Sequence, residues 1–324
     1  GDSLPSFTGT PVTGVNVIAD YEPLTREYYG IDFGITGFLP YEIQTIRHTI
    51  TLTGLEPGTT YMYRIGSAEN GWWSDIGSFT TSGGDDSQFT FFHMTDTQST
   101  SPEQYENGWA KVMQAAYSLY PDARFVLHTG DFVDNGDNFK QWQWFFDSAA
   151  GTILNSAIMP VSGNHDAYGM DVLVNNFKIN YDGEDYDMDD PFADLDSYFQ
   201  YTDSGIYYSF DYNNAHFAIL NSNDLKENGE LTDEQLEWLT NDMQSSDAEW
   251  KIVAFHKAVY SNGDHYKDDD VVGLRGQLAT LMPQLQVDLV LNGHDHVYFR
   301  TEPLNNNTVD ADCNHDVIMQ NGTA

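Results

Sequence analysis

Five short clusters of oxygen- and nitrogen-bearing side chains are spaced along the chain, and each follows an apolar run. The runs are short and rich in β-branched, aromatic or leucine residues, which is typical of buried strands. Polar side chains at the carboxyl ends of parallel strands converge on one crevice in an open α/β sheet. The sequence therefore predicts an α/β domain with one composite site. The clusters lie at 95–98, 130–134, 163–166, 255–257 and 293–296.

The side chains in these clusters are of the kinds that bind transition metals. Carboxylates and amides are combined with imidazoles, and such mixed donors suit Zn²⁺, Mn²⁺ or Fe²⁺ better than Ca²⁺ or Mg²⁺. Any one cluster alone would more often be a turn, because Asp and Asn beside Gly are common turn formers. His294 and His296 are two residues apart, so on an extended segment both would face one side and Asp295 would point away.

The five clusters, in this order, resemble the motifs of the calcineurin-like metallophosphoesterases, most closely those of the purple acid phosphatase branch. The resemblance covers nearly the whole chain. It implies an αββα catalytic domain, in which two sheets pack together and helices flank them. It also implies an enzyme, a metal-dependent phosphatase or phosphoesterase that hydrolyses ester bonds. Helix-start signals and periodicity predict helices at 103–120, around 138–148, at 232–244 and near 274–282.

Two divalent ions about 3.5–4 Å apart can lower the pKa of a bound water and offset the charge of a phosphoryl group. Such a pair needs a bridging carboxylate, and Asp131 after Gly130 is the natural candidate. By resemblance, Asp96, Gln98 and His296 would hold one ion, and Asn164, His256 and His294 would hold the other.

The resemblance also indicates the catalytic residues. His165 would contact the phosphate, either as a transition-state stabiliser or as the acid that protonates the leaving group, and Asp166 would orient it. His265 lies in a loop, 262–266, whose counterpart in purple acid phosphatases carries a substrate-contacting histidine.

Two positions depart from the purple acid phosphatase pattern. Those enzymes have a tyrosine that ligates ferric iron and gives the colour, where this chain has Asp134. They have glycine where this chain has Gln98, which either ligates a metal or only hydrogen-bonds a water. Because no phenolate is available, we predict a colourless enzyme with two divalent ions, either Mn, Fe or Zn.

Other conspicuous residues have structural interpretations. His93 and His128 lie at the ends of predicted strands beside the site and are expected to support it or to belong to the core. His216 lies in another strand-like run and is expected to be structural. The aromatic run 142–146 is typical of core packing by an amphipathic helix, and the acidic segment 182–196 of an exposed loop near the site mouth.

The first quarter of the chain is predicted to be a separate all-β domain. Pro57 and Gly58 predict a turn, after which Tyr61 and Tyr63 alternate onto one face. The stretch resembles a fibronectin type III-like sandwich with Tyr61 as the corner tyrosine. The same module precedes the catalytic domain in plant and many bacterial purple acid phosphatases. We expect domains at 1–84 and 85–324, with a packing role for the first and carbohydrate or surface binding as the alternative.

The chain carries 50 Asp and Glu against 13 Lys and Arg, a net charge of −37. Such a surface repels nucleic acids and anionic membranes, so neither is an expected partner. Small phosphate esters are easier substrates than phytate or polyphosphate for the same reason. Either halophily or secretion from an ordinary bacterium explains the charge.

The single cysteine, Cys313, allows no internal disulfide, and no span reaches about 20 apolar residues. These features suit a secreted or cell-surface bacterial protein, although a cytosolic protein could look the same. We expect a mature or trimmed start without its signal peptide, and a trimmed end.

Dinuclear metal-dependent hydrolysis of phosphate esters, above all phosphomonoesters, is therefore the predicted function. Phosphodiester or nucleotide hydrolysis on the same site is the alternative. A non-catalytic surface-binding module is disfavoured, because none of the seven predicted ligand positions holds an inert residue. The sequence leaves the oligomeric state open.

Overall fold

The computed structural model describes residues 14–29, 40–67, 71–84, 88–136, 138–166, 207–305 and 307–309. The acidic segment 182–196 and Cys313 lie outside the described residues.

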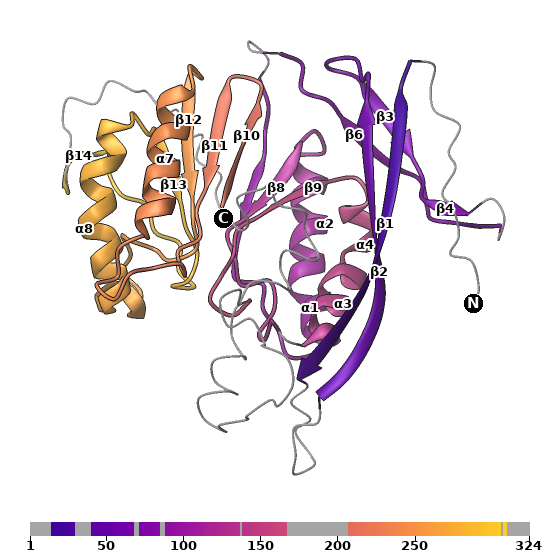
Figure 1. Cartoon of the computed structure of the whole chain (residues 1–324), viewed down its shortest axis with the longest axis horizontal. Helices are drawn as coiled ribbons and strands as arrows, with labels where there is room; N and C mark the ends of the chain where they lie inside the picture. Colours follow the sequence, from indigo (N-terminus) through magenta and orange to yellow (C-terminus); the bar gives the residue numbers. More distant parts are fainter. Residues whose placement is uncertain are drawn as a thin grey trace.

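Two central sheets face each other (Figure 1). The first is wholly parallel, with β8 in the middle, and consists of β7 (Phe92–Met94), β8 (Phe125–His128) and β9 (Ala157–Pro160). In the second, the edge strand β10 is antiparallel to β11 and the others are parallel. This sheet consists of β10 (Tyr208–Tyr212), β11 (Ala215–Ile219), β12 (Trp250–Ala254) and β13 (Leu289–Leu291).

Strand alternation places side chains in three apolar layers. Phe125 and Leu127 of β8 point between the two sheets, where they pack with Phe217 of β11 and Ile252 of β12. Val126 lies between them in sequence and faces the opposite way, toward the helices. Each fully buried large apolar side chain contributes about 1.5–3 kcal/mol to folding. Both sheets therefore have apolar side chains packed against both faces, and strands buried on two faces are expected to have continuous apolar runs.

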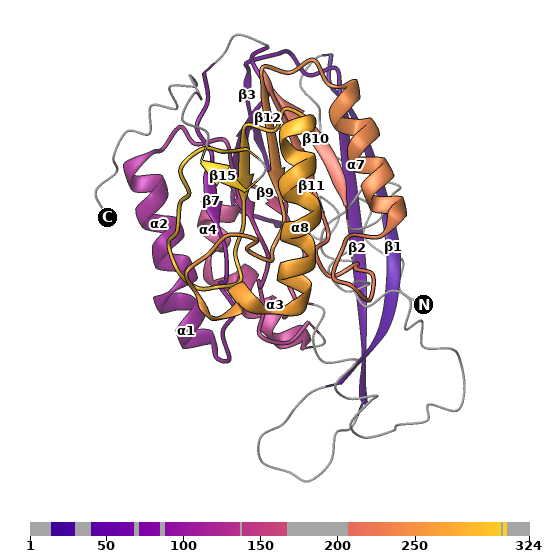
Figure 2. The ribbon, with the colours of Figure 1, turned by 90° about the vertical axis from the view of Figure 1, so that its left-hand side faces the viewer.

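Helices cover the outer face of each sheet, as Figure 2 shows for α7 and α8. Over the first sheet lie α1 (Pro102–Asn107), α2 (Trp109–Leu119), α3 (Phe139–Ser148) and α4 (Ala150–Ile153). Over the second lie α7 (Asp233–Ser245) and α8 (Asp269–Gln284), the latter preceded by the short 3-10 helix η1 (Asp264–Lys267). The predicted αββα order of layers is confirmed.

Two helix predictions were wrong in detail. The single helix expected at 103–120 is broken at Gly108, whose backbone (φ −99°, ψ −94°) leaves the helical region. The helix expected at 274–282 begins earlier, because Asp268 is extended and Asp269 and Asp270 occupy the first turn. Carboxylates there are stabilised by the helix dipole.

The first quarter of the chain, where described, consists of antiparallel strands. Its strands are β1 (Asn16–Tyr29) paired with β2 (Pro40–Thr53), β3 (Thr60–Tyr63) with β6 (Gly77–Thr80), and β4 (Gly66–Ser67) with β5 (Trp72–Trp73). The Tyr61 hydroxyl accepts the Glu56 N–H at 2.8 Å, a bond of the kind made by a corner tyrosine. The small hairpin of β14 (Leu304–Asn305) and β15 (Thr308–Val309) lies at the other end of the described chain.

Polar contacts join this first quarter to the rest. Tyr63 donates its hydroxyl hydrogen to the Leu154 carbonyl at 2.8 Å, and the Ser78 N–H donates to Asn155 Oδ1 at 3.0 Å. Near the linker, the Ser82 hydroxyl and the Gly83 N–H both donate to Asn213 Oδ1 at the tip of the β10–β11 hairpin. Among the residues that the structure describes, none of the helices has the length and apolar character needed to span a bilayer.

His216 links β10, β11 and α7, which confirms a structural environment for it. Nδ1 lies 2.6 Å from Asp211 Oδ1, and Nε2 lies 2.8 Å from Asp242 Oδ2. Burial alone would lower the pKa of His216, but the hydrogen bonds and charges of Asp242 and Asp211 outweigh it and raise that pKa. The stabilisation is thus fully present below the unfolded pKa of about 6.5 and is lost as pH rises through the folded pKa.

We predict that His216→Gln destabilises the protein more at about pH 5 than at about pH 9. Asp242→Asn should cost about 1.5–3 kcal/mol, as expected for a hydrogen bond to a charged group. Asp211→Asn should cost less, because that side chain is 74 % exposed against 17 % for Asp242. Urea unfolding of each variant beside the wild type at both pH values checks this. A His216→Gln penalty independent of pH would contradict it.

Candidate metal centre

All five clusters meet at the carboxyl ends of the strands, as predicted. The clusters at 95–98, 130–134 and 163–166 follow β7, β8 and β9, and those at 255–257 and 293–296 follow β12 and β13. Backbone bonds join neighbouring clusters within each sheet: Asp96 N–H donates to Gly130 O at 3.0 Å, and Gly293 N–H donates to His256 O at 2.8 Å. Between the sheets, the His294 N–H donates to Asp96 Oδ1 at 3.0 Å.

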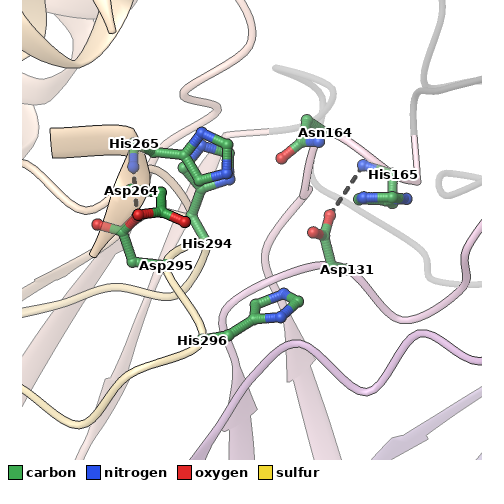
Figure 3. A pocket seen from close by; sticks show the side chains of 8 residues that line it. All are labelled: Asp131, Asn164, His165, Asp264, His265, His294, Asp295 and His296. Atoms are coloured by element: carbon green, nitrogen blue, oxygen red, sulfur yellow. Dashed lines mark hydrogen bonds between the residues drawn. The ribbon is translucent and has the colours of Figure 1, made fainter. Parts of the chain in front are cut away.

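Three of the clusters, at 130–134, 163–166 and 293–296, line an open pocket of about 320 Å³ together with the loop of His265 (Figure 3). The lining residues are Asp131, Asn164, His165, Asp264, His265, His294, Asp295 and His296.

Two groups of three metal-binding side chains share one carboxylate. Asp131, His256 and His294 form one group, and their ligand atoms lie within 4.8 Å of one another. Asp131 also forms such a group with Asp96 and His296. A carboxylate common to two adjacent groups is in the position that a bridging ligand requires.

The buried side of the centre is arranged around His256. Its Nδ1 lies 2.8 Å from the Thr129 carbonyl, which can only accept, so Nδ1 carries a proton. Nε2 faces Asn164 Oδ1 at 3.0 Å and Asp131 Oδ2 at 3.2 Å. Burial opposes a charge on His256, but the charge and hydrogen bond of Asp131 outweigh it and raise the pKa of His256 to about 9. The proton on Nε2 therefore lies between two oxygen acceptors, at a place that a cation also suits.

His294 completes this side as a neutral imidazole. Its ring centroid lies 5.0 Å from that of His256. Burial, followed by the charges of His256 and His265, lowers the pKa of His294 to about 4. The ring thus keeps a lone pair for a metal at neutral pH.

The more exposed side contains Asp96, Gln98 and His296. His296 Nε2 lies 3.5 Å from Asp96 Oδ1, and Gln98 Nε2 lies 3.1 Å from His296 Nε2 and 3.4 Å from Asp131 Oδ2. Gln98 Oε1 is buried without a hydrogen-bond partner in the described part of the chain. Because the two ends of an amide are assigned from their bonds, turning it by 180° directs Oε1 at the same two ligand atoms. The residues on this side also fit a cation.

Four of the seven predicted ligands have left-handed backbone conformations. The φ angles are +54° for Asp96, +56° for Asp131, +78° for His294 and +52° for His296. Such conformations cost about 1–3 kcal/mol each and persist only where the surroundings impose them.

The extended segment predicted at 293–296 is therefore wrong. His294 and His296 serve different groups of ligands. Asp295 does turn away from Asp131, toward the His265 N–H at 2.9 Å, but the cause is this bond and not strand alternation (Figure 3).

Asp166 was predicted to orient His165, and in the described part of the chain its hydrogen bonds are instead to the backbone around Asp131 and at Gly163. Its buried carboxylate accepts the backbone N–H groups of Asp131, Phe132, Val133 and Gly163, at 3.0, 2.9, 3.3 and 2.9 Å. Burial, followed by the charge of Asp131, raises the pKa of Asp166 to about 8, and the amides of Gly163 and Val133 oppose that rise. Asp166 therefore shapes the loop that carries Asp131.

His165 and His265 both line the pocket, from opposite sides. The His165 N–H donates to Asp131 Oδ1 at 2.8 Å, and its Nδ1 lies 2.9 Å from the Asp134 carbonyl. The His265 ring lies 4.1 Å from that of His294, and its Nδ1 lies 2.8 Å from Asp268 Oδ2. His265, Asp268 and His294 form a third close group at the rim.

Gly163 is required by the close approach of two clusters. A Cβ there would lie 2.2 Å from both the backbone N and Oδ1 of Asp131. Any side chain at this position would displace the shared carboxylate.

Sequence reasoning missed a sixth polar segment, at the end of β11. The Lys257 N–H donates to Ser222 Oγ at 3.1 Å, and Asn223 Nδ2 donates to Ser162 O at 3.4 Å. The segment thereby supports two of the clusters. The signal was a polar run directly after an apolar run, 216–220, that was interpreted only as a strand.

His93 and His128 have the supporting place predicted for them. His93 Nε2 lies 2.9 Å from Thr129 Oγ1, and His128 Nε2 lies 3.0 Å from Thr97 Oγ1, behind the ligand loops. Burial lowers the pKa of His93 to about 4 and that of His128 to about 3, so both are neutral.

Some of the curated proteins that are similar to this chain are named as acid phosphatases. Purple acid phosphatase 18 of Arabidopsis thaliana is 25% identical over 291 residues, 84% of this chain and 57% of its own length. Acid phosphatase type 7 of Mus musculus is 26% identical over 280 residues, 80% of this chain and 58% of its own length. An uncharacterised protein of Mycobacterium tuberculosis is 28% identical over 187 residues, 52% of this chain. The chain spans 57%, 58% and 32% of these three relatives, respectively.

A solved structure shares the fold. The purple acid phosphatase from yellow lupin (Lupinus luteus) seeds matches with a TM-score of 0.66 at 19% identity, over 94% of this chain and 57% of its own. The model of the purple acid phosphatase N-terminal domain matches residues 12–81. The model of the calcineurin-like phosphoesterases matches residues 56–298, well over half of the chain. Together with the two ligand groups joined at Asp131, this match shows that the chain belongs to the calcineurin-like phosphoesterase family.

Proposed function

We propose that this protein is a dinuclear metal-dependent phosphoesterase that acts on phosphomonoesters. The observation that carries the proposal is the sharing of Asp131 by two groups of ligands. A site for a single metal would use one group of ligands. Here the buried carboxylate of Asp131 has a separate group of metal-binding side chains on each side, which is what two ions require. The relatives named as acid phosphatases support the same reaction class.

In this proposal, Asp131 bridges two ions and six other residues complete the centre. Two divalent ions bound there would lower the pKa of a water molecule and offset the charge on the phosphoryl oxygens. Only two of the seven side chains, Asp96 and Asp131, are anionic, so the centre keeps a net positive charge, which suits a dianionic phosphomonoester. One ion would be held by Asp96, Gln98 and His296, and the other by Asn164, His256 and His294.

His165 is the proposed acid or transition-state stabiliser. Because the Asp134 carbonyl can only accept, Nδ1 of His165 carries a proton and Nε2 is the atom that can exchange one with the leaving oxygen. The bond from its backbone N–H to Asp131 Oδ1 holds the His165 backbone beside the shared ligand, and the Nδ1 contact orients the ring. On the opposite wall, His265 would contact the same phosphate.

The pocket favours substrates with a single phosphate. Among the described residues, its lining contains no lysine or arginine and includes Asp264 and Asp295. Lys257, from the fourth cluster, is paired with Asp270 at 2.6 Å. A second phosphate would meet carboxylates without a cation to balance it, so phytate and polyphosphates are poor substrates. Phosphodiesters or nucleotides are the second candidate, since the side chain of His296 is 61% exposed and leaves that side open to a further substituent.

We further propose domains at 1–84 and 85–324, the first a fibronectin type III-like packing module, and a secreted or cell-surface location. The strand pairs before residue 81 and the acidic composition support these assignments. The charge of −37 speaks against nucleic acid as a partner.

We predict that the protein binds two equivalents of Mn²⁺ or Zn²⁺ and that Asp131→Asn weakens both sites, because it removes the shared charge. Metal content after dialysis, measured by plasma mass spectrometry, checks this. His93→Gln is the matched control, since His93 is buried nearby but bonds to Thr129. Equal metal content in Asp131→Asn and the wild type would contradict a bridging role.

Stripped protein refilled with Mn²⁺, Zn²⁺ or Fe²⁺ should hydrolyse p-nitrophenyl phosphate faster than bis-p-nitrophenyl phosphate. Asp131→Asn should abolish turnover, and His165→Ala should lower kcat by about 10²–10⁴-fold, as expected for a lost acid. Faster turnover of the diester would favour the second candidate function. Absence of turnover with either ester and every metal would overturn the proposal.

The protein as isolated should be colourless, because Asp134 replaces the iron-binding tyrosine of purple enzymes. Its visible spectrum should lack a tyrosinate-to-iron band. Asp134→Tyr, loaded with iron under air, is the variant to compare with the wild type. If only this variant shows the band, the missing phenolate is the cause of the absent colour. A band in the wild type would refute the prediction.

A further inference from the structure

The loop that carries His265 is attached to the last ligand cluster by a bond that spans 30 residues of sequence. The His265 N–H donates to Asp295 Oδ1 at 2.9 Å. Asp295 lies between His294 and His296, both of which have left-handed backbones. The position of the Asp295 carboxylate is therefore set by the conformation of the two ligand residues beside it.

The fit between the two segments is close. A Cβ at Gly263 would lie 2.6 Å from Asp295 Cγ and 2.7 Å from its Cβ and Oδ1, so only glycine allows the approach. The Gly263 N–H donates to Ser261 Oγ at 2.9 Å, which fixes the start of the loop.

The imidazole of His265 is oriented by contacts on two further sides. Its Nδ1 lies 2.8 Å from Asp268 Oδ2, and the Asp268 N–H donates to the His265 carbonyl at 3.0 Å. Its ring lies against the His294 ring, 4.1 Å between centroids and tilted by 32°. With Nδ1 bonded to a carboxylate, Nε2 is the nitrogen left for a substrate oxygen.

We propose that Asp295 is a positioning residue that places His265 at a fixed distance from the metal ligands, with Asp268 setting the rotation of its ring. This inference rests on the proposed function, in which His265 Nε2 hydrogen-bonds a phosphoryl or leaving-group oxygen. A displacement of about 1 Å in such a group can lower a rate by about 10²-fold, so a link to the ligand segment has a catalytic consequence.

One acceptor atom makes the bond. Asp295 Oδ2 is buried and has no hydrogen-bond partner within the described residues. Asp295→Asn therefore keeps the acceptor that His265 uses, whereas Asp295→Ala removes it. Comparing the two variants separates the negative charge, which both of them remove, from the acceptor side chain, which only Asp295→Ala removes.

The first test needs no activity. In the metal-free protein, amide exchange of His265, followed by NMR or by mass spectrometry of peptides covering 262–268, should be faster in Asp295→Ala than in the wild type. Asp295→Asn should exchange at close to the wild-type rate. Gly263→Ala, which separates the segments without removing a polar group, should also speed exchange. Unchanged exchange in Asp295→Ala and Gly263→Ala would overturn the proposal.

The second test is a double-mutant cycle on kcat/KM for p-nitrophenyl phosphate, with His265→Ala, Asp295→Ala and both together. Asp295→Ala should lower kcat/KM at least about 10-fold in the wild-type background and have no further effect in His265→Ala, because it acts through that residue. Asp295→Asn should restore most of the loss. Equal losses in both backgrounds, or loss of bound metal in Asp295→Ala, would overturn a positioning role.

The outcomes keep the two proposals apart. A wild-type protein without turnover of either ester defeats the proposed function, while the exchange experiment still decides whether Asp295 holds the His265 loop. If the wild type turns over substrate but the effects of His265→Ala and Asp295→Ala on kcat/KM are additive, the proposed function stands and the positioning role of Asp295 is refuted.

Discussion

The buried carboxylate of Asp131 is the interaction on which the rest of the site depends. It lies 3.2 Å from His256 Nε2 on one side, and on the other it belongs to a second group with Asp96 and His296. Burial favours a neutral carboxyl, yet the charge and hydrogen bond of His256 and the contacts of His165 keep the pKa of Asp131 below its usual value. A buried charge of this kind needs a cation or a set of donors close by. The hydrogen-bond donors, the other ligands and the loop conformations around Asp131 together provide this stabilisation.

The surrounding framework explains how such a residue stays in place. Four backbone amides fix the Asp166 carboxylate against the Asp131 loop, and Gly163 leaves room for that loop where any Cβ would collide with it. The left-handed conformations of Asp96, Asp131, His294 and His296 carry a local cost that the packed sheets offset. The rigid αββα core, with apolar side chains on both faces of each sheet, supplies the free energy.

The charge distribution adds a second constraint. A net charge of −37 repels anions at long range, whereas the proposed centre carries only two anionic ligands for two divalent ions. Salt screens the long-range field over about 8–10 Å, while interactions inside the pocket are screened less. Capture of an anionic substrate should therefore depend on the proposed metals at short range, since the described residues that line the pocket include no lysine or arginine.

The sequence alone predicted the strands and the polar clusters that meet at the candidate metal centre. Apolar runs such as 125–127 and 251–255 predicted the strands, and polar clusters behind them predicted one composite site, because alternation and strand-end position are local properties. The sequence shows glycines beside Asp131 and Asn164. It does not show which close contacts require a glycine at those positions.

Only the tertiary structure decided the pairings between distant segments. It broke the predicted helix at Gly108, gave His294 and His296 left-handed backbones, added the segment at Ser222 and joined Asp295 to His265. Residues 30 to 198 positions apart make these contacts, and their distances follow from the packing of both sheets at once. Sequence periodicity reports which side a residue faces, whereas the left-handed angles and close approaches arise when the whole core sets the backbone.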